Sequence, residues 1–158
     1  MKRPRLYVDT SVFGGMIDEE FREPSLRLFE RIQADEFIVL LSDETVRELT
    51  RAPEAVKAVW KNLPSESVEE IEVTDDMFAL ANAYVEKGIL GQASLSDAIH
   101  VAAATVACAD LIVSWNFKHI VNYRRIQLFN AENMRQGYTT IDIRSPLELG
   151  YDNENENI

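Results

Sequence analysis

The chain has 158 residues, a formal net charge of −11 and a single cysteine, Cys108. Its length suits one domain, and one cysteine excludes both an internal disulfide and a cysteine-rich zinc site, which favours a reducing compartment such as the cytoplasm. The excess of acids argues against broad, non-specific binding of nucleic acids, which relies on basic surface. The longest uncharged apolar stretch, residues 98–109, is too short to span a membrane.

Short apolar runs alternate with segments of helical periodicity along the whole chain. In the first half these patterns predict a strand over residues 6–8, a helix over 24–34, a strand over 37–41, a helix from 43 that is interrupted at Pro53 and resumes over 55–60, an aperiodic acidic connection over 65–70 and a strand over 70–73. In the second half they predict helices over 74–87 and 94–107, a strand over 111–113, a helix over 118–133 and a strand over 139–143. This alternation predicts an α/β fold, a three-layer α/β/α sandwich around a parallel sheet.

The last residues differ in composition from the rest of the chain. Residues 145–158 end in alternating asparagine and glutamate, which is typical of a disordered acidic segment. We therefore expect a single domain over residues 1–144, followed by a flexible acidic tail over residues 145–158.

Residues suited to capping support several of the predicted helix boundaries. Ser42 and Thr74 stand where each can cap the helix that follows, and Gly88 stands where a helix C-terminus favours glycine. Ser94 and Asp97 form a capping-box-like pair, although aspartate replaces the usual glutamate. The helix that this pair begins is apolar on nearly every face, so we expect it to be buried.

Two polar residues directly follow predicted strands. Asp9 ends the first strand, and Asn116 lies in the loop after the strand over residues 111–113. In open α/β sheets ligands bind beyond the carboxyl ends of the strands, so both residues are expected at the edge where a ligand would bind. Asp110 precedes its strand and is therefore expected at the opposite edge.

The helix after the second strand carries two glutamates that could approach Asp9. Val46 and Leu49 define its inward direction, and at about 100° per residue Glu44 points nearly opposite to them, whereas Glu48 lies at the edge of the apolar face. Glu48 is thus the better candidate to reach the strand ends. The alternative is that both glutamates are ordinary solvated charges.

The buried helix over residues 94–107 begins with a further candidate acid, Asp97. A carboxylate that enters an apolar environment needs a partner, or it becomes protonated. His100 shares that side of the helix and could be its hydrogen-bond partner, as a structural histidine rather than a metal ligand. Alternatively, Asp97 is only a capping acid at the helix N-terminus.

Clustered carboxylates would repel one another unless a cation neutralised them. Oxygen ligands of this kind select Mg²⁺ or Mn²⁺ rather than zinc, and such an ion is suited to phosphoryl chemistry. If Asp9, Glu48 and Asp97 converge, the sequence therefore predicts a site for one of these two ions.

At these positions the sequence resembles a PIN-domain nuclease of the type found in VapC toxins of toxin–antitoxin pairs. The resemblance rests on residues 7–11 (YVDTS), 41–49 (LSDETVREL), 96–104 (SDAIHVAAA) and 109–116 (ADLIVSWN). These motifs are spread over nearly the whole predicted fold. The resemblance implies a PIN-like fold and a Mg²⁺- or Mn²⁺-dependent endoribonuclease that leaves a 5′-phosphate and a 3′-hydroxyl, with an antitoxin protein as a partner and a homodimer as the assembly.

The resemblance also assigns roles to individual residues. Asp9, Glu48 and Asp97 match the metal-binding acids of the family, and Asn116 stands where the family usually has a fourth. The matching hydroxyls that flank the site are Ser11 and Ser114. Because an amide oxygen brings no charge, Asn116 leaves open a second reading, a catalytically weakened PIN-like module that binds RNA or protein.

Basic residues gather after the last motif, and they are Lys118, His119, Arg124, Arg125 and Arg135. The first four are candidates for contacts with RNA phosphates, whereas Arg135 is more simply a solvated charge. Trp115 could stack on a base, although packing beneath a loop is the more common role for such a residue. Lys2, Arg3 and Arg5 precede the first strand and are expected at the opposite edge.

Overall fold

The computed structural model describes residues 2–150, and a parallel β-sheet lies at their centre. Within this range the sheet has five strands in the order β3-β2-β1-β4-β5, and every neighbouring pair is parallel. The strands are β1 (Arg5–Val8), β2 (Ile38–Ser42), β3 (Val68–Ile71), β4 (Leu111–Val113) and β5 (Asp142–Arg144). The parallel sheet confirms the predicted α/β class.

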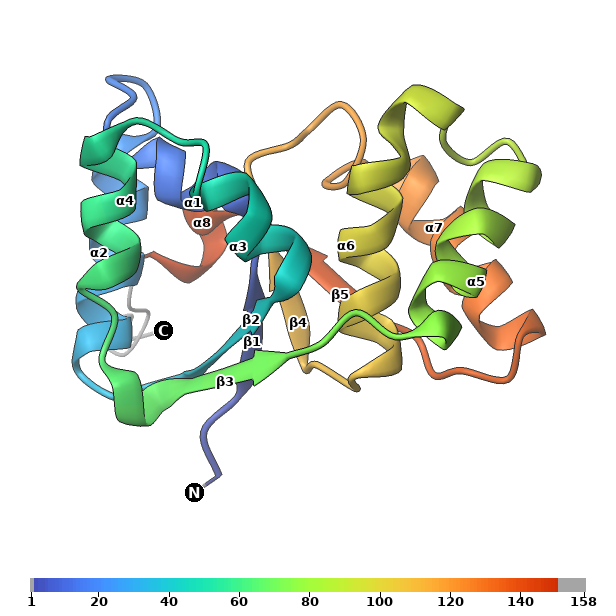
Figure 1. The fold of residues 1–158 in the computed structure, drawn as a ribbon, viewed down its shortest axis with the longest axis horizontal. Helices are drawn as coiled ribbons and strands as arrows, with labels where there is room; N and C mark the ends of the chain where they lie inside the picture. The colour runs from blue at the N-terminus through green and yellow to red at the C-terminus, as the bar shows by residue number, and fades with distance from the viewer. Residues whose placement is uncertain (1, 151–158) are drawn as a thin grey trace, which may run out of the picture.

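Helices cover both faces of the sheet. They are α1 (Thr10–Gly15), α2 (Arg22–Gln33), α3 (Asp43–Leu49), α4 (Glu54–Lys61), α5 (Asp75–Glu86), α6 (Leu95–Val106), α7 (Tyr123–Arg135) and α8 (Pro146–Leu149). Figure 1 shows α1, α2, α4 and α8 on one side of the sheet and α5, α6 and α7 on the other. The predicted three-layer sandwich is therefore confirmed.

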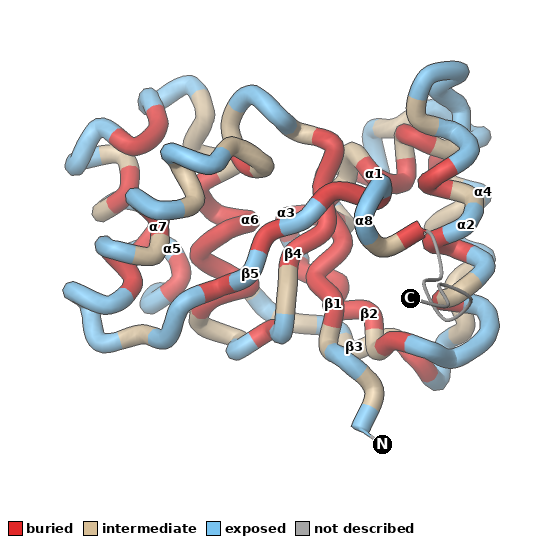
Figure 2. The backbone as a smooth tube through the Cα atoms, turned by 180° about the vertical axis from the view of Figure 1, so that it is seen from behind, coloured by how far each residue is buried: buried red, intermediate tan, exposed pale blue. Residues whose placement is uncertain are grey.

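Side chains of alternate strand residues divide the core in two. Tyr7 of β1 belongs to the cluster that packs against α5, α6 and α7, whereas its neighbours Leu6 and Val8 pack against α1 and α2. Burial extends along β1 and β2 and through α6, as Figure 2 shows, and α6 is buried over residues 98–105. The prediction of a buried helix at this position is confirmed.

The strand order reverses at β1. The chain passes from β1 to β2 and β3 on one side and then returns to place β4 and β5 on the other. The crevice beyond the carboxyl ends of β1 and β4 is thus the switch point at which ligands bind in folds of this type. Asp9 directly follows β1, and Ser114 directly follows β4, so both lie at this crevice.

Several element boundaries differ from those predicted. Strand β3 begins at Val68, two residues before the predicted start, because Val68 pairs with Val39 of β2. Helix α7 begins at Tyr123, not at residue 118, because the side chain of Asn122 accepts a hydrogen bond from the backbone N–H of Arg125 and caps the helix there. The last strand spans Asp142–Arg144, later than the predicted residues 139–143.

The predicted capping residues have mixed outcomes. The hydroxyls of Ser42 and Thr74 accept backbone N–H bonds and cap their helices, as expected. Gly88 has a φ of +73°, the left-handed conformation that favours glycine after a helix. The capping box at Ser94 is wrong: a 3-10 turn, Gln92–Ser94, leads directly into α6, and the Ser94 hydroxyl instead lies 3.5 Å from Nδ1 of His119.

Part of the predicted tail is packed on the domain. Helix α8 lies against α2, with Pro146 buried and the carbonyl of Leu149 accepting a 2.6 Å hydrogen bond from Arg31. The expectation of a flexible tail from residue 145 is therefore incorrect for α8, because its apolar side chains contact α2. The rest of that tail, residues 151–158, lies outside the described residues.

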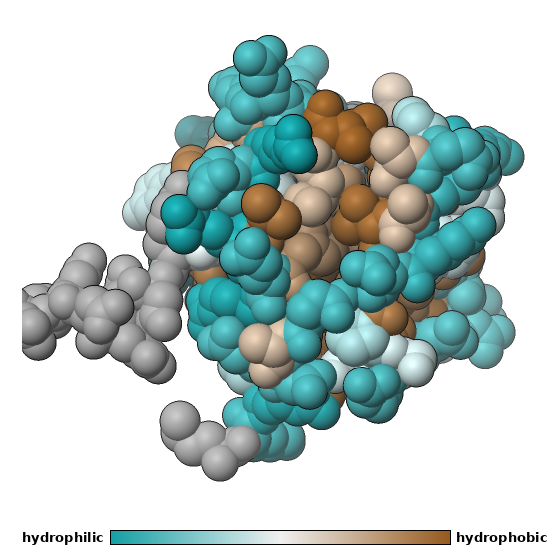
Figure 3. Space-filling model, turned by 90° about the vertical axis from the view of Figure 1, so that its left-hand side faces the viewer, coloured by the Kyte–Doolittle hydropathy of each residue, from teal (hydrophilic) through white to brown (hydrophobic). Residues whose placement is uncertain are grey.

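A shallow groove separates α2 from α4. The cavity has a volume of about 610 Å³, and its lining includes Met16, Leu26, Phe29 and Val59. Figure 3 shows this side of the molecule, where apolar surface is framed by hydrophilic residues.

In the part of the chain that the structure describes, every helix is too short or too polar to cross a membrane.

Candidate functional site

Asp9 is the central carboxylate at the switch point. Its side chain is almost completely buried, and its Oδ2 accepts hydrogen bonds from Ser11 Oγ at 2.6 Å and Ser114 Oγ at 2.8 Å. Both hydroxyls therefore orient one oxygen of the carboxylate. The other oxygen, Oδ1, faces Nε2 of His100 at 3.7 Å.

His100 faces two carboxylates with one ring nitrogen, Nε2, and is 1% exposed. Its Nδ1 lies 2.7 Å from the hydroxyl of Tyr7, and its Nε2 lies 2.5 Å from Oε1 of Glu48. Burial alone would lower the pKa of His100, but Tyr7 and the negative charges of Glu48 and Asp9 raise it well above its ordinary value. The carboxylates of Asp9 and Glu48 therefore both face Nε2 of His100.

The predicted pairing of His100 with Asp97 is wrong. Although these residues are three positions apart on α6, the His100 ring points down to Tyr7 in the sheet and across to Glu48 on α3. The hydroxyl of Tyr7, a buried residue of the sheet, fixes the orientation of the His100 ring. Asp97 has a different hydrogen-bond partner. The prediction that His100 is a satisfied structural histidine agrees with its contacts.

Glu48 on α3 contacts the same histidine as Asp9. Its Oε1 accepts a hydrogen bond from Thr10 Oγ1 at 2.8 Å, and its Oε2 lies 3.4 Å from the hydroxyl of Ser96. Burial would raise the pKa of Glu48, but the hydrogen bond and charge of His100 outweigh this effect and lower it. The side chain remains 32% exposed, so solvent reaches the carboxylate.

Glu44 does not point into solvent as the helical geometry suggested. It is 8% exposed, forms an ion pair with Arg47 and accepts a 2.6 Å hydrogen bond from Ser96 Oγ. The side of α3 on which Glu44 lies is covered by α6, which packs against α3 and brings Ser96 to this glutamate. A prediction based on one helix could not include this neighbour.

Asp97 and Asn116 form the second half of the site through His119. Oδ2 of Asp97 lies 2.9 Å from Nδ1 of His119, and Oδ1 of Asn116 accepts the backbone N–H of His119 at 2.9 Å. The backbone N–H of Asn116 in turn donates to Ser114 Oγ at 2.9 Å. Because Ser114 also donates to Asp9, this serine connects the two halves.

The predicted site residues thus share one edge of the sheet without forming a closed cluster. Asp9 and Glu48 meet at His100, whereas Asp97 and Asn116 meet at His119. Among residues 2–150, no three histidine, cysteine, aspartate or glutamate side chains are placed to hold a metal ion together. The donor set nevertheless suits Mg²⁺, which usually binds one or two carboxylates and keeps several waters.

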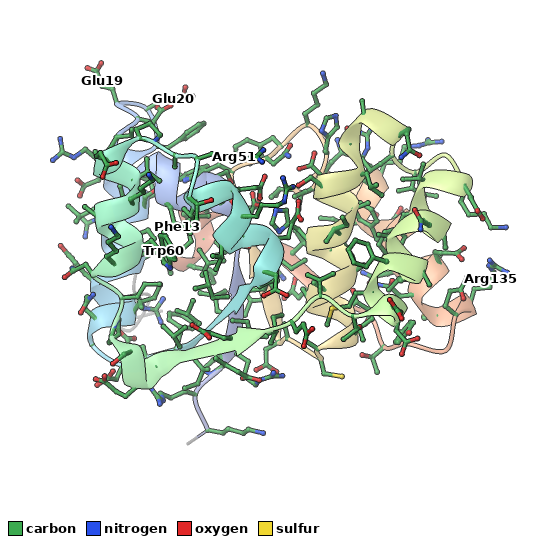
Figure 4. The ribbon with its side chains drawn as sticks, in the orientation of Figure 1. Phe13, Glu19, Glu20, Arg51, Trp60 and Arg135 are labelled. Atoms are coloured by element: carbon green, nitrogen blue, oxygen red, sulfur yellow. The ribbon has the colours of Figure 1, made fainter. Side chains whose placement is uncertain are left out.

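The predicted phosphate-contacting residues differ in what they contact. Lys118 and Arg124 are exposed. The guanidinium of Arg125 donates to the carbonyls of Ile89 at 3.2 Å and Lys118 at 2.9 Å, so it joins two loops to α7. Arg135 is paired with Glu132, and Figure 4 shows it at the outer end of α7, away from the site.

Trp115 packs beneath a loop and is not available to stack on a base. Its ring is 6% exposed and stacks on Phe21 with centroids 4.2 Å apart, and its Nε1 donates to Ser25 Oγ at 2.8 Å. At the opposite edge of the sheet, Asp110 accepts a 2.6 Å hydrogen bond from the backbone of Arg5. The predicted placement of Asp110 and Arg5 away from the site is confirmed.

Three residues that support the site were not predicted. Tyr7 positions His100, while Thr10 and Ser96 donate to the carboxylates of α3. Thr10 directly follows Asp9, and this adjacency was the only sequence signal for its role. A tyrosine in a buried strand and a serine at a helix start are too common to indicate such roles.

Comparisons with known proteins identify the fold. No protein-family model matches the chain, and no curated protein matches it by sequence. Among solved structures, VapBC2 from Rickettsia felis, determined bound to a DNA fragment from their promoter, aligns with a TM-score of 0.56 and 12% identity over 89% of this chain and 98% of that one. VapC20 from Mycobacterium tuberculosis, described as a sarcin-ricin loop cleaving toxin, aligns with a TM-score of 0.55 and 17% identity over 87% and 98%. The chain therefore has the PIN-like fold of VapC toxins.

Proposed function

We propose that this protein is a Mg²⁺- or Mn²⁺-dependent endoribonuclease and the toxin of a toxin–antitoxin pair. The observation that carries the proposal is the convergence of Asp9 and Glu48 on one ring nitrogen, Nε2 of His100, at the switch point of the sheet. The fold likeness to VapC proteins, one of which is described as a toxin that cleaves the sarcin-ricin loop, agrees with it.

Asp9 and Glu48 would hold the metal ion, with Asp97 and Asn116 as further oxygen ligands at the rim. All of the hydrogen bonds that described residues donate to the Asp9 carboxylate reach Oδ2, which leaves Oδ1 as a donor for a cation. The bound ion would lower the pKa of a coordinated water and stabilise charge on the phosphate.

The protein's own residues orient these ligands. Ser11 and Ser114 hold the Asp9 carboxylate in one orientation, and His100 and Thr10 hold Glu48. Partners of this kind fix the position of metal ligands, and their loss usually weakens metal binding.

The test is a cleavage assay on a mixed pool of RNA, with Mg²⁺, with Mn²⁺ and with EDTA. We expect cleavage by the parent protein only with a metal ion, and we expect Asp9→Asn to abolish it. Asp76→Asn on the exposed start of α5 is the matched control, because it removes the same charge far from the site and should leave cleavage unchanged. Cleavage that persists in Asp9→Asn would place the chemistry elsewhere.

A second candidate function is RNA binding without cleavage. Two observations favour it: the amide oxygen of Asn116 is already bound to the backbone of His119, and no three-residue metal cluster is formed within residues 2–150. In that case the parent protein would bind the RNA pool, no metal would promote cleavage, and neither Mg²⁺ nor Mn²⁺ would raise its Tm.

An antitoxin partner and a homodimer complete the proposal. The VapBC2 neighbour from Rickettsia felis, bound to a promoter DNA fragment, supports a partner protein of this kind. Sedimentation velocity of the purified chain, alone and after co-expression with the gene beside its own, tests both assemblies. A monomer that gains no partner would contradict them.

A further inference from the structure

The surface that begins at the loop after β4 is unusual for so acidic a chain. The whole chain has 27 acidic residues against 16 lysines and arginines, yet none of these acids lies between Asp110 and Glu132. This segment contains the loop that follows Asn116 and most of α7. Positive charge is therefore concentrated directly beside the candidate site.

A second element adds to this charge. Lys87, at the end of α5, lines a cavity of about 350 Å³ together with Arg124, Arg125 and Leu128 of α7 and residues Gly88 and Ile89. Among residues 2–150, no acidic side chain lines this cavity. Glu132 is close enough to act electrostatically on Lys87, but its carboxylate is held by Arg135.

The positive groups differ in their availability. Arg125 is a structural residue, because its guanidinium holds the carbonyls of Ile89 and Lys118. Lys87 and Arg124 are exposed and line the same cavity. These two side chains are thus available to bind an anion from solvent.

An exposed aromatic residue directly precedes Arg124 at the start of α7. Tyr123, the first residue of α7, is 78% exposed, the largest exposure among the big hydrophobic side chains of the described residues. Its hydroxyl accepts a 2.8 Å hydrogen bond from Gln127 one turn later, which holds the ring along the helix. Proteins bind single-stranded nucleic acids by combining cations that bind the phosphates with exposed rings that stack on the bases.

The cavity and the candidate site are connected through one loop. The backbone carbonyl of Lys118 accepts a hydrogen bond from Arg125 at the cavity. The next residue, His119, contacts Asp97 in the site. Figure 1 shows this loop and the connection between α5 and α6 at the same end of the molecule, beyond the carboxyl ends of the strands. A single strand could therefore occupy both.

We propose that Lys87, Arg124 and Tyr123 form an exosite for single-stranded RNA, in which the cations bind phosphates and the tyrosine stacks on a base. This inference rests on the proposed function, because it takes RNA as the substrate. It goes beyond that function by assigning affinity to a surface outside the carboxylate site.

The test measures the affinity of a fluorescein-labelled, mixed-sequence single-stranded RNA in EDTA, by anisotropy at several salt concentrations. The double variant Lys87→Ala with Arg124→Ala should bind the RNA more weakly. The plot of log K against log salt should become less steep by about 1.4, the contribution of two phosphates of a single strand. Lys2→Ala with Lys61→Ala is the matched control, because it removes two exposed cations elsewhere. It should leave the slope within experimental error of the parent value.

The stacking contact has its own pair of variants. Tyr123→Ala should weaken the binding of single-stranded RNA by about fivefold to a hundredfold, the usual range for one stacked base. Tyr123→Phe keeps the ring and loses the contact with Gln127, so it should bind like the parent. A duplex RNA should be insensitive to both changes.

The outcomes separate this inference from the proposed function. If the parent binds and cleaves RNA but the exosite variants bind like their controls, the exosite is wrong and the nuclease stands. If the parent neither binds nor cleaves RNA, both are wrong. If the double variant changes only the sedimentation coefficient, the surface is a protein contact, which also overturns the exosite.

Discussion

Replacement of Tyr7 by phenylalanine tests the network that positions the site. The Tyr7 side chain is completely buried, and its hydroxyl lies 2.7 Å from both Ser42 Oγ and His100 Nδ1. Without it, Ser42 keeps its bond to the backbone of Thr45, but within residues 2–150 no other hydrogen bond reaches Nδ1 of His100. A buried polar group left unpaired costs about 1–3 kcal/mol.

A loss of about 2 kcal/mol corresponds to a fall in Tm of about 4–8 °C for a domain of this size. Urea denaturation of Tyr7→Phe and the parent, with equal m-values, measures the difference in the free energy of unfolding. The control is Tyr123→Phe, the same chemical change on an exposed ring, which should alter stability by less than about 0.5 kcal/mol. Equal stabilities for the two variants would refute the assignment of Tyr7 as the partner of His100.

Three further predictions concern packing, the metal and acid stability. Gly15→Ala should cost about 1–3 kcal/mol in urea denaturation, because the new Cβ would lie 2.4 Å from Ser25 Oγ. Asn116→Asp should tighten Mn²⁺ binding in calorimetry and lower the metal-free Tm, since it adds a fourth carboxylate; unchanged values would exclude residue 116 from the site. Burial raises the pKa of Glu44, but Arg47, Ser96 and His100 together outweigh burial and lower that pKa. The stability from Glu44 is therefore present above its unfolded pKa and is lost as pH falls through the folded one. Glu44→Gln should therefore be less stable than the parent at neutral pH, and the difference in stability should shrink as the pH falls below the usual pKa of a glutamate.

The sequence alone determined the class of fold and the edge on which the site lies. Buried parallel strands appear as short continuous apolar runs, so Asp9 and Asn116 could be assigned to the carboxyl ends of their strands and Asp110 to the other edge. Helical periodicity also placed Glu48 within reach of Asp9. These predictions need only the order of strands and helices along the chain and the parallel direction of the strands. Both can be inferred from the pattern of apolar and polar residues in a single sequence.

The partners of these residues were decided only by the tertiary structure. Glu44 is buried because α6 packs across α3, and His100 turns from Asp97 to Tyr7 and Glu48 because the sheet lies beneath α6. The hydrogen-bond partners of a side chain come from elements far away in sequence, and a periodic pattern contains no information on which elements become neighbours. The sequence could thus identify the carboxylates, whereas the packing of α6 against both the sheet and α3 decided which histidine each of them contacts.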